Sequence, residues 1–411
     1  MKKFLLGICA GLLVLCACGN DKTKDGSFSP GNDDTKMQTG TKQTQTEIQS
    51  GIQSQTKAEA QPETSTQAVT TPQDSQEQDA VLRILNSMTL EEKVGQMFFV
   101  RCPENGAVED VSKYHFGGYL LFGRDFAGKT QEEVKAMTAA YQEASGIPLF
   151  IGVDEEGGSV VRVSSNDALW NHKFLSPQEI FQSQGMEGFV TDTAEKASML
   201  ALYGINVNFA PVCDVSTDAA DFIYRRSLGQ DANVTAEFAG MVVGEMQNYR
   251  IASVLKHFPG YGDNVDTHTG IAIDNRSYES FAETDFLPFL SGMQAGAEFI
   301  LVSHNIVMCM DADLPASLSP AVHEVLRSKL LFDGIILTDD LAMEALNAYS
   351  QENRAAVLAV LAGNDMIVTT DYAGQIPAVI EAVHNKEIDI SVIDNAVYRI
   401  LTIKYKLGLI S

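Results

Sequence analysis

Short apolar runs alternate with longer amphipathic stretches along most of this chain. The apolar runs have the continuity of strands that are covered on both faces, and they lie at residues 95–100, 118–122, 149–153, 206–210, 253–255, 299–302, 334–337 and 366–368. Between them, apolar residues recur at helical spacing, in stretches that include residues 131–144, 191–203, 232–249 and 281–295. The pattern therefore predicts eight strands with helices between them.

Eight strands alternating with helices predict an α/β fold, a (β/α)8 TIM-type barrel, formed as a single domain over residues 81–411. The domain is expected to begin with a helix at 81–88, followed by a capping box between Thr89 and Glu92, and to end in a helix at 388–409. A doubly wound open sheet is the rival arrangement of the same elements. No G-x-G-x-x-G turn follows the first strand, and this favours the barrel.

The N-terminal residues have the features of a bacterial export signal. Lys2 and Lys3 precede an apolar run at residues 4–17, which is too short to span a bilayer comfortably. The run ends in Leu-Cys-Ala-Cys-Gly, which resembles a lipoprotein signal in which Cys18 is lipidated. We therefore expect residues 1–18 to be a lipoprotein signal peptide and the mature chain to be extracytoplasmic, anchored to the cell membrane by lipid. An ordinary cleaved secretory signal is the alternative.

Residues 19–80 are rich in Thr, Gln and Ser and contain almost no large apolar side chains. Such a segment cannot bury enough apolar surface to offset the entropy that it would lose on ordering. We therefore expect residues 19–80 to form a disordered tether, which would act as a spacer between the membrane and the folded domain.

The charge and the cysteines limit the partners of the chain. The formal net charge is −25, so no nucleic acid is expected as a partner, and the membrane is expected as one only through the lipid anchor. Beyond the signal, the cysteines are Cys102, Cys213 and Cys309. This odd, scattered set forms neither a disulfide framework nor a metal-ligand motif, so we interpret these cysteines as small core residues. His–Asp pairs can also bind metals, but no third ligand stands at metal spacing in the sequence, so no metal and no cofactor are expected.

Polar and charged residues follow five of the eight predicted strands. They are residues 154–158 with Arg162, Asp214 with the Arg225–Arg226 pair, Lys256, residues 303–305, and Thr338 with Asp339 and Asp340. The strands of a parallel barrel end at one face, where barrel enzymes place their active sites. An aspartate after a strand commonly caps the next helix, but capping alone does not explain so many charged strand ends.

The most polar of these segments is KHFPGYGDNVDTHTG, at residues 256–270. Its density of ionisable groups indicates a loop that holds a polar ligand and transfers protons. Gly260 and Gly262 allow tight turns there, and we interpret them as a hinge for a mobile arm.

The ionisable groups fit cleavage of a sugar. Retaining cleavage of a glycosidic bond needs an anionic nucleophile at the anomeric carbon and a proton donor at the leaving oxygen. Asp339 can supply the nucleophile. Histidine titrates near neutral pH, and a nearby carboxylate such as Asp266 can orient it and stabilise its charged form.

Several motifs give the chain its resemblance to a known family. They are DEEGGSVVR at 154–162, NFAPVCDV at 208–215, RRSLG at 225–229, KHFPGYGDNVDTHTG at 256–270, PASLS at 315–319 and ILTDDLAMEAL at 336–346. In this order they resemble the family 3 glycoside hydrolases, and within these the single-domain β-N-acetylglucosaminidases. The K-H-F-P-G-x-G segment is highly specific, and the D-x-H that follows it marks the subclass.

The resemblance implies a role for each matching residue. It makes Asp339 the nucleophile and His268 the general acid/base, with Asp266 as the partner of His268. It also implies a sugar-binding set, which is Asp154, Arg162, Arg226, Lys256 and His257. The chain departs from the family at three positions, with Glu155 and Ser159 where Gln and Arg are frequent and Tyr261 where the subclass often has His.

The resemblance predicts a retaining exo-β-N-acetylhexosaminidase that removes terminal β-linked N-acetylglucosamine from cell-wall-derived or other glycans, as in peptidoglycan turnover. A monomer without cofactor is expected. The alternatives are a β-glucosidase or β-xylosidase of the same family, phosphorolysis in place of hydrolysis, and a non-catalytic sugar-binding lipoprotein.

Several of the polar residues also have an ordinary structural interpretation. Asp340 fits the N-cap of the following helix, and His257 fits a buried histidine that bonds the strand-end backbone. Arg225 is expected at the surface and Asp214 within the loop structure, while His304 fits either kind of role.

Overall fold

The computed structural model describes residues 72–264, 270–346, 349 and 353–411. The predicted signal peptide with Cys18, and the tether as far as residue 71, lie outside the described residues. Asp266 and His268 also lie outside them.

Eight parallel strands form the centre of the domain, in the order β10-β1-β2-β3-β4-β5-β7-β9. Their bounds are Phe98–Arg101 (β1), Gly118–Leu121 (β2), Phe150–Val153 (β3), Val207–Asn208 (β4), Ala252–Phe258 (β5), Phe299–Val302 (β7), Ile335–Thr338 (β9) and Ile367–Thr369 (β10). All eight predicted strands are confirmed, and β5 is longer than predicted, because it includes Lys256 and His257.

The first and last strands of this order meet, so the sheet closes on itself. The Thr338 N–H donates to the carbonyl of Met366 at 3.2 Å, and the Met366 N–H donates to the carbonyl of Ile336 at 3.1 Å. These bonds join β9 to the start of β10, and a parallel bridge pairs Leu337 with Met366. The predicted barrel is therefore confirmed and the open-sheet alternative is wrong.

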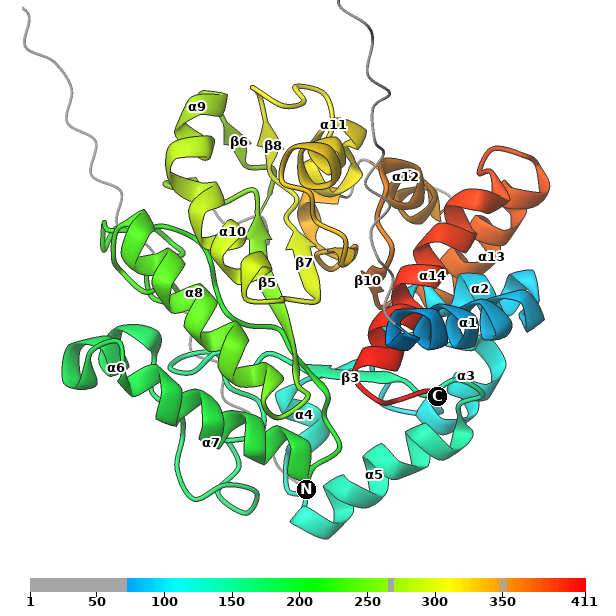
Figure 1. The fold of residues 1–411 in the computed structure, drawn as a ribbon, viewed down its shortest axis with the longest axis horizontal. Coiled ribbons are helices and arrows are strands. Elements are labelled where there is room, and N and C mark those ends of the chain that lie inside the picture. The colour runs from blue at the N-terminus through cyan, green and yellow to red at the C-terminus, as the bar shows by residue number, and fades with distance from the viewer. Residues whose placement is uncertain (1–71, 265–269, 347–348, 350–352) are drawn as a thin grey trace, which may run out of the picture. The chain divides into compact units, whose positions relative to one another are not determined.

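Helices pack around the outside of the sheet (Figure 1). The helices are α1 Pro72–Ser87, α2 Leu90–Gln96, α3 Ala107–Tyr114, α4 Gly123–Phe126, α5 Gln131–Ala144, α6 Pro177–Gln184, α7 Gly188–Leu202, α8 Ala232–Gln247, α9 Tyr278–Ser280, α10 Phe286–Gln294, α11 Pro320–Glu324, α12 Arg354–Ala362, α13 Tyr372–His384 and α14 Ile390–Lys406. A π-helical turn, Phe281–Asp285, precedes α10, and β6 (Ile273–Asp274) pairs with β8 (Ile306–Val307) in a small separate sheet. Within the described ranges, no helix combines the length and the apolar character that a membrane span requires.

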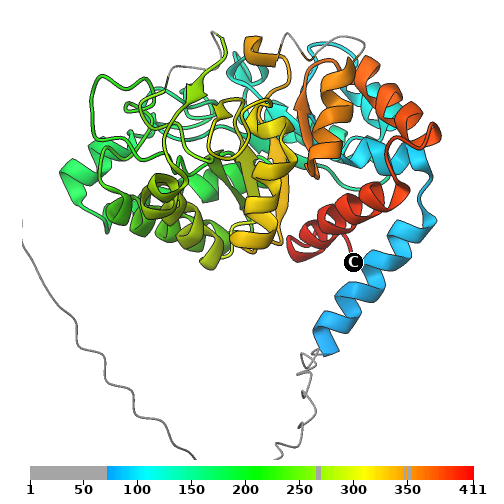
Figure 2. The same cartoon turned by 90° about the horizontal axis from the view of Figure 1, so that it is seen from above.

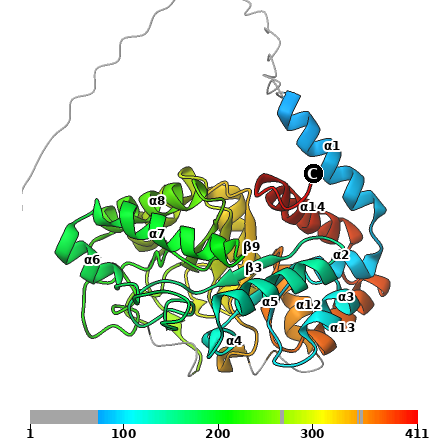
Figure 3. The same ribbon diagram turned by 90° about the horizontal axis from the view of Figure 1, so that it is seen from below.

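Helix α1 begins at Pro72, so the predicted boundary at residue 80 falls inside it, and that boundary is wrong. The helix lies beside α14 (Figure 2) and buries Ala80, Val81 and Leu85. Residues 72–80, which are too polar to fold by themselves, are therefore helical because the second half of α1 packs on the domain. Figure 3 shows α1 and α14 at one end of the domain and α4 at the other.

The capping box before α2 is confirmed. The Glu92 N–H donates to Thr89 Oγ1 at 3.2 Å, and the Thr89 N–H donates to Glu92 Oε2 at 2.8 Å. Each side chain therefore satisfies a backbone N–H that the helix leaves without an intrahelical partner.

Aromatic rings fill the interior of the barrel. The ring of Phe99 lies 6.3 Å from that of Phe150 and 5.2 Å from that of Phe209, and Phe150 in turn contacts Phe299. A side chain at Gly152 would place its Cβ 2.8 Å from Phe209 and 2.9 Å from Phe99, so glycine there makes room for the rings. The barrel is therefore a packed core, and a ligand site can open only at its ends.

The cysteine interpretation is only partly right. Cys102 and Cys213 are buried, as expected for small core residues, whereas Cys309 is exposed. All three are free thiols. The sequence could not distinguish Cys309 from the two buried cysteines, since its exposure follows from its place just beyond the short strand β8.

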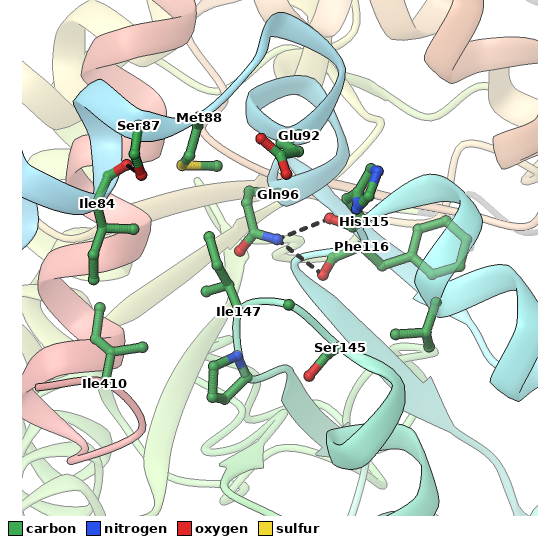
Figure 4. Close-up of a pocket in the computed structure, with 13 residues that line it drawn as sticks. Ile84, Ser87, Met88, Glu92, Gln96, His115, Phe116, Ser145, Ile147 and Ile410 are labelled. Carbon is green, nitrogen blue, oxygen red and sulfur yellow. Dashed lines mark hydrogen bonds between the residues drawn. The ribbon is translucent and has the colours of Figure 1, made fainter.

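An unusual lysine lies buried near the N-terminal ends of the strands. Lys404 of α14 is fully buried. Its Nζ donates to Gln96 Oε1 at 2.6 Å and lies 5.0 Å from the centre of the Phe150 ring. The Gln96 amide in turn donates to the carbonyls of His115 at 2.8 Å and Phe116 at 3.2 Å (Figure 4). No described carboxylate forms an ion pair with Lys404, and burial holds the pKa of its amine well below the usual value.

Replacing Lys404 by Met should flatten the pH dependence of stability. In the wild type, the unfolded chain binds a proton at Lys404 that the folded chain releases. The free energy of unfolding therefore rises with pH up to about pH 10, by at most about 1.4 kcal/mol per pH unit from this group. Urea unfolding between about pH 7.5 and pH 9.5 should show a smaller slope for Lys404→Met than for the wild type. The exposed Lys406→Met variant is the control, and an equal slope in all three proteins would contradict the prediction.

Candidate active site

A cavity of about 450 Å³ opens at the C-terminal ends of the strands. All the predicted site residues that the structure describes line it, and they are Asp154, Arg162, Arg226, Lys256, His257 and Asp339. Arg225, in contrast, is exposed, as predicted. The closed sheet thus brings together residues that are far apart in the sequence.

Another cavity, of about 300 Å³, lies between α1, α2 and residues 145–148 (Figure 4). Its apolar wall includes Ile84, Ile147 and Ile410. The buried Gln96 amide that borders it already bonds two carbonyls and Lys404, so it offers no free polar group to a ligand. The cavity at the C-terminal ends, where charged groups converge, is therefore the candidate active site.

Lys256 lies between two carboxylates of the segment that follows β3. Its Nζ lies 2.8 Å from Asp154 Oδ1 and 2.6 Å from Glu156 Oε1, and its side chain is 2% exposed. Arg162 Nη2 lies 3.4 Å from the other Asp154 oxygen. Burial alone would raise the pKa of Asp154, but Lys256 and Arg162 outweigh it and hold that pKa below the usual value.

Glu156 is a site residue that the sequence analysis missed. Its carboxylate accepts hydrogen bonds from Arg226 Nη2 at 2.7 Å and Arg226 Nε at 3.0 Å, and it also contacts Lys256. Burial would raise the pKa of Glu156, but the two cations hold it far below the usual range, and the same pairing raises the pKa of Arg226. Glu156 therefore fixes two predicted sugar-binding cations at once. Its neighbour Glu155 points elsewhere and accepts from the N–H groups of residues 162–164.

His257 is oriented by Asp214, which the sequence analysis had interpreted as loop structure. The Nδ1 atom lies 2.7 Å from Asp214 Oδ2, and Nε2 lies 3.2 Å from Arg226 Nη2. Because a guanidinium can only donate, Nε2 accepts and the proton resides on Nδ1, where it bonds the carboxylate. Asp214 also accepts from the N–H of His257 at 3.2 Å and of Tyr261 at 2.8 Å.

Asp339 differs from the other carboxylates of the cavity. Its N–H donates to the carbonyl of Val302 at 2.9 Å, and its Oδ1 accepts from the N–H of Asp340 at 2.8 Å. Among the residues that the structure describes, no cation forms an ion pair with Asp339, whereas Asp154 and Glu156 are both paired. The Asp339 carboxylate is thus left available to a ligand in the cavity.

Asp340 caps a turn and forms an ion pair. Its Oδ1 accepts from the N–H of Ala342 at 3.0 Å, which agrees with a capping role, although the segment that follows is a turn and not the expected helix. Its Oδ2 lies 3.1 Å from Arg101 Nη1. Burial, with Asp339 beside it, raises the pKa of Asp340. His304 is fully buried and its Nε2 lies 3.0 Å from the carbonyl of Asp340, so this histidine supports the turn.

Two arginines at the rim pack on one aromatic ring. The guanidinium carbons of Arg101 and Arg162 lie 4.3 Å and 5.3 Å from the centre of the Phe122 ring. The sequence analysis missed Arg101 and Phe122, although the position of each directly at a strand end was a usable signal. Asp266 and His268 lie outside the described residues, and the chain is described again from Gly270.

Within the described ranges, no three His, Cys, Asp or Glu side chains converge as ligands of a metal ion. The chemistry that the described residues offer is an unpaired carboxylate facing a set of fixed hydrogen-bond donors and acceptors. Such a set can bind a polyhydroxylated ligand and direct a nucleophile at it.

Comparison with known proteins agrees with this geometry. Residues 89–403 match the family model described as the glycosyl hydrolase family 3 N terminal domain. The chain therefore belongs to glycosyl hydrolase family 3, and it is a glycoside hydrolase.

Individual relatives are similar in sequence and in structure. A β-hexosaminidase of Nitrosomonas eutropha is 30% identical over 260 residues, which cover 61% of this chain and 73% of that protein. A family 3 β-N-acetylglucosaminidase from Paenibacillus sp. superposes with a TM-score of 0.73 at 28% identity. The match covers 79% of this chain but only 63% of the Paenibacillus chain. A β-N-acetylhexosaminidase from Beutenbergia cavernae superposes with a TM-score of 0.69 at 28% identity, covering 77% of this chain and 98% of its own.

Replacing Glu156 by Gln should destabilise the protein in a pH-dependent way. Removing one partner of a buried ion pair costs about 3–5 kcal/mol at neutral pH, because Lys256 and Arg226 lose their shared counter-ion. Since the folded pKa of Glu156 is depressed, its contribution is present above the unfolded pKa of about 4.3 and is lost as pH falls below it. Denaturant unfolding of wild type and variant should therefore differ most near neutral pH and converge in acid.

The exposed Glu179→Gln variant is the control for this comparison. Glu179 also has a lowered pKa, through hydrogen bonds to Ser176 at the start of α6, but it pairs with no buried cation. Its substitution should change stability much less, and an equal effect of the two substitutions would contradict the role given to Glu156.

Proposed function

We propose that this chain is a retaining exo-β-N-acetylhexosaminidase that hydrolyses terminal β-linked N-acetylglucosamine. The observation that carries the proposal is the contrast among the carboxylates in and next to the cavity. Asp154 and Glu156 are committed to Lys256 and Arg226, while Asp339 pairs with no described cation. A nucleophile has to be free to approach the anomeric carbon, and the Asp339 carboxylate lines the cavity without a described cationic partner.

The remaining charged groups suit a sugar ring. Asp154 can accept hydrogen bonds from hydroxyl groups, while Arg162, Arg226 and Lys256 can donate to ring substituents. His257 can act on a hydroxyl once the ligand replaces its contact with Arg226. Because each of these groups is held by a charged neighbour, little reorganisation is needed on binding, which favours tight and oriented binding.

The proposed reaction has two steps. Asp339 attacks the anomeric carbon and forms a glycosyl ester, while the bond to the leaving oxygen breaks and His268 gives that oxygen its proton. His268 then takes a proton from water, which attacks the same carbon and releases Asp339. Asp266 would orient His268 and stabilise its charged form between the steps. Both residues lie outside the described residues, so their roles rest on the resemblance of the D-x-H motif.

The substrate class is supported by relatives and by the shape of the cavity. Similar proteins are named β-hexosaminidase or β-N-acetylglucosaminidase. Below the cavity the barrel is closed by rings, including Phe99 and Phe209. A pocket that is closed at one end receives the end of a glycan and not its middle, and this supports exo action.

The proposed location follows from the N-terminal sequence alone. We propose that Cys18 is lipidated and that the preceding residues are removed, so that the enzyme acts outside the cytoplasm while anchored to the cell membrane. An extracytoplasmic position gives access to cell-wall glycans. Incorporation of labelled palmitate into the wild type, and its loss in Cys18→Ala, would support this location; equal labelling of both proteins would refute it.

Asp339→Ala should lower kcat/KM on an aryl N-acetylglucosaminide by about 10⁴-fold or more, because it removes the group that forms the glycosyl ester. The matched control is Asp340→Asn, which removes a neighbouring carboxylate and leaves the proposed nucleophile in place. The control should retain far more activity. Turnover by Asp339→Ala within tenfold of the wild type would refute the assignment. The retaining outcome is tested separately, because proton NMR of the first-formed sugar should show the β-anomer.

A panel of aryl β-glycosides should separate the proposed activity from its alternatives. We expect kcat/KM for the N-acetylglucosaminide to exceed that for the glucoside and the xyloside by at least about 10²-fold, since a site built to bond a substituent rejects analogues that lack it. Comparable rates on the glucoside would favour a β-glucosidase. Release of a sugar 1-phosphate in phosphate buffer would indicate phosphorolysis.

A further inference from the structure

A buried ion cluster lies at the base of the segment that follows β5. The guanidinium of Arg276 bonds Asp274 through Nη2 at 2.8 Å and Nε at 3.0 Å, and bonds Asp285 through Nη1 at 2.9 Å. Both carboxylate side chains are at most 2% exposed, and the guanidinium carbon lies 4.2 Å from the centre of the Phe281 ring. Both carboxylates of the cluster are thus bonded to Arg276, which is the only cation of the cluster among the described residues.

The cluster also joins two separate parts of the chain. Arg276 Nη2 donates to the carbonyl of Gly260 at 3.1 Å, and the Asn264 amide donates to Asp274 Oδ2 at 2.7 Å. Residues 260–264 precede the segment that contains Asp266 and His268, and Asp274 and Arg276 follow it. The side chain of Arg276 therefore ties the two ends of that segment together.

The same residues are tied to the sugar-binding side of the cavity. Asp214 accepts from the Tyr261 N–H through Oδ1 and from His257 through Oδ2, at 2.8 Å and 2.7 Å. The Gly260 N–H donates to the carbonyl of His257 at 2.8 Å. A continuous series of bonds thus runs from His257, through residues 260–261, to Arg276.

The two glycines of this stretch have a packing reason that differs from the hinge interpretation. A Cβ at Gly260 would lie 2.2 Å from Asp285 Oδ1, and a Cβ at Gly262 would lie 2.6 Å from the Arg276 guanidinium carbon. Both residues also have positive φ angles, of 119° and 55°. Glycine is required there because the backbone lies directly against the ion cluster, which indicates a fixed attachment of the segment.

A purely structural role is the competing explanation, and the chain contains a close comparison for it. Arg327 also pairs with a buried aspartate, Asp365, donates to two carbonyls, those of Phe332 and Gly334, at 2.7 Å each, and lies over an aromatic ring. The arginine side chains are similarly exposed, 24% for Arg276 and 21% for Arg327. Arg327 does not line the candidate active site, so it resembles Arg276 in its kinds of contact but not in its location. It differs in one respect, because Asp365 also pairs with Arg399.

From these contacts we infer that Arg276 is a positioning residue for proton transfer: by fixing the two ends of the segment that carries His268, it sets where the general acid meets the leaving oxygen. The inference rests on the proposed function, since it takes His268 as the acid/base. Loss of Arg276 should impair protonation of the leaving group more than binding of the sugar, because His257 and Lys256 keep their own partners.

The test uses the dependence of kcat/KM on the leaving group. Aryl N-acetylglucosaminides with acidic phenols need little protonation, whereas those with weakly acidic phenols depend on the general acid. For Arg276→Gln we expect kcat/KM to fall less than about tenfold with the most acidic phenol but about 10²–10³-fold with the least acidic one. The basic limb of the pH profile of kcat/KM, which reports the acid, should shift or disappear. Competitive binding of N-acetylglucosamine should change little.

Arg327→Gln is the matched control. It should also lower thermal stability, although Asp365 keeps Arg399 as a partner, and it should keep the leaving-group dependence and pH profile of the wild type. Arg276→Lys, which retains the charge but cannot bond Asp274, Asp285 and Gly260 together, should show an intermediate dependence. Asn264→Ala removes one link and leaves the ion cluster whole, so it carries the same test if Arg276→Gln does not fold.

His268→Ala, measured in parallel, separates failure of this inference from failure of the proposed function. If His268→Ala keeps the wild-type dependence on the leaving group, the proposed acid/base is wrong. If His268→Ala becomes strongly dependent while the Arg276 variants and Asn264→Ala follow the wild type, the positioning role is overturned and the proposed function stands. A steeper dependence in Arg327→Gln as well would show a general effect of destabilisation and would also overturn it.

Discussion

The site depends on one buried cation. Lys256 lies on β5 with 2% of its side chain exposed, and it is acceptable there only because Asp154 and Glu156 reach it from the end of β3. An unpaired charge at this depth would cost several kcal/mol, so the three residues require one another. Their pairing has a chemical consequence, because it commits Asp154 and Glu156 to cations. Asp340, which also lines the cavity, pairs with Arg101, so Asp339 is the cavity carboxylate without a described cationic partner.

From Lys256 the polar contacts extend in both directions. Glu156 also pairs with Arg226, and Arg226 contacts His257. His257 is in turn oriented by Asp214. Asp214 then holds the backbone of Tyr261, next to the glycine that Arg276 bonds. Sugar binding and the attachment of the following loop are therefore parts of one hydrogen-bonded network. Such a network is rigid where each member is satisfied, and rigidity at this place suits a site that has to align a nucleophile with a proton donor.

The fold was largely predictable because its signal is local. Each strand of the barrel is a short apolar run, and each helix has its own periodicity, so the number and order of elements follow from the sequence. Closure of the sheet between β9 and β10 depends on backbone bonds such as Thr338 to Met366, which no local pattern contains. The start of the domain was misjudged for a similar reason. The first residues of α1 are polar, and the helix is stabilised by burial of Val81 and Leu85 in the assembled domain, with α14 beside it.

For the active site, the sequence by itself determined which ionisable residues stand at the strand ends and, through its motifs, the family. It could not determine which charges pair. Glu155 and Glu156 are adjacent and chemically identical, yet one bonds backbone N–H groups and the other bonds Lys256 and Arg226. Asp214 appeared to be ordinary loop structure until the fold placed it against His257. Only the tertiary structure decided these roles, because the charge state and orientation of a side chain are set by partners that are near in space and distant in sequence.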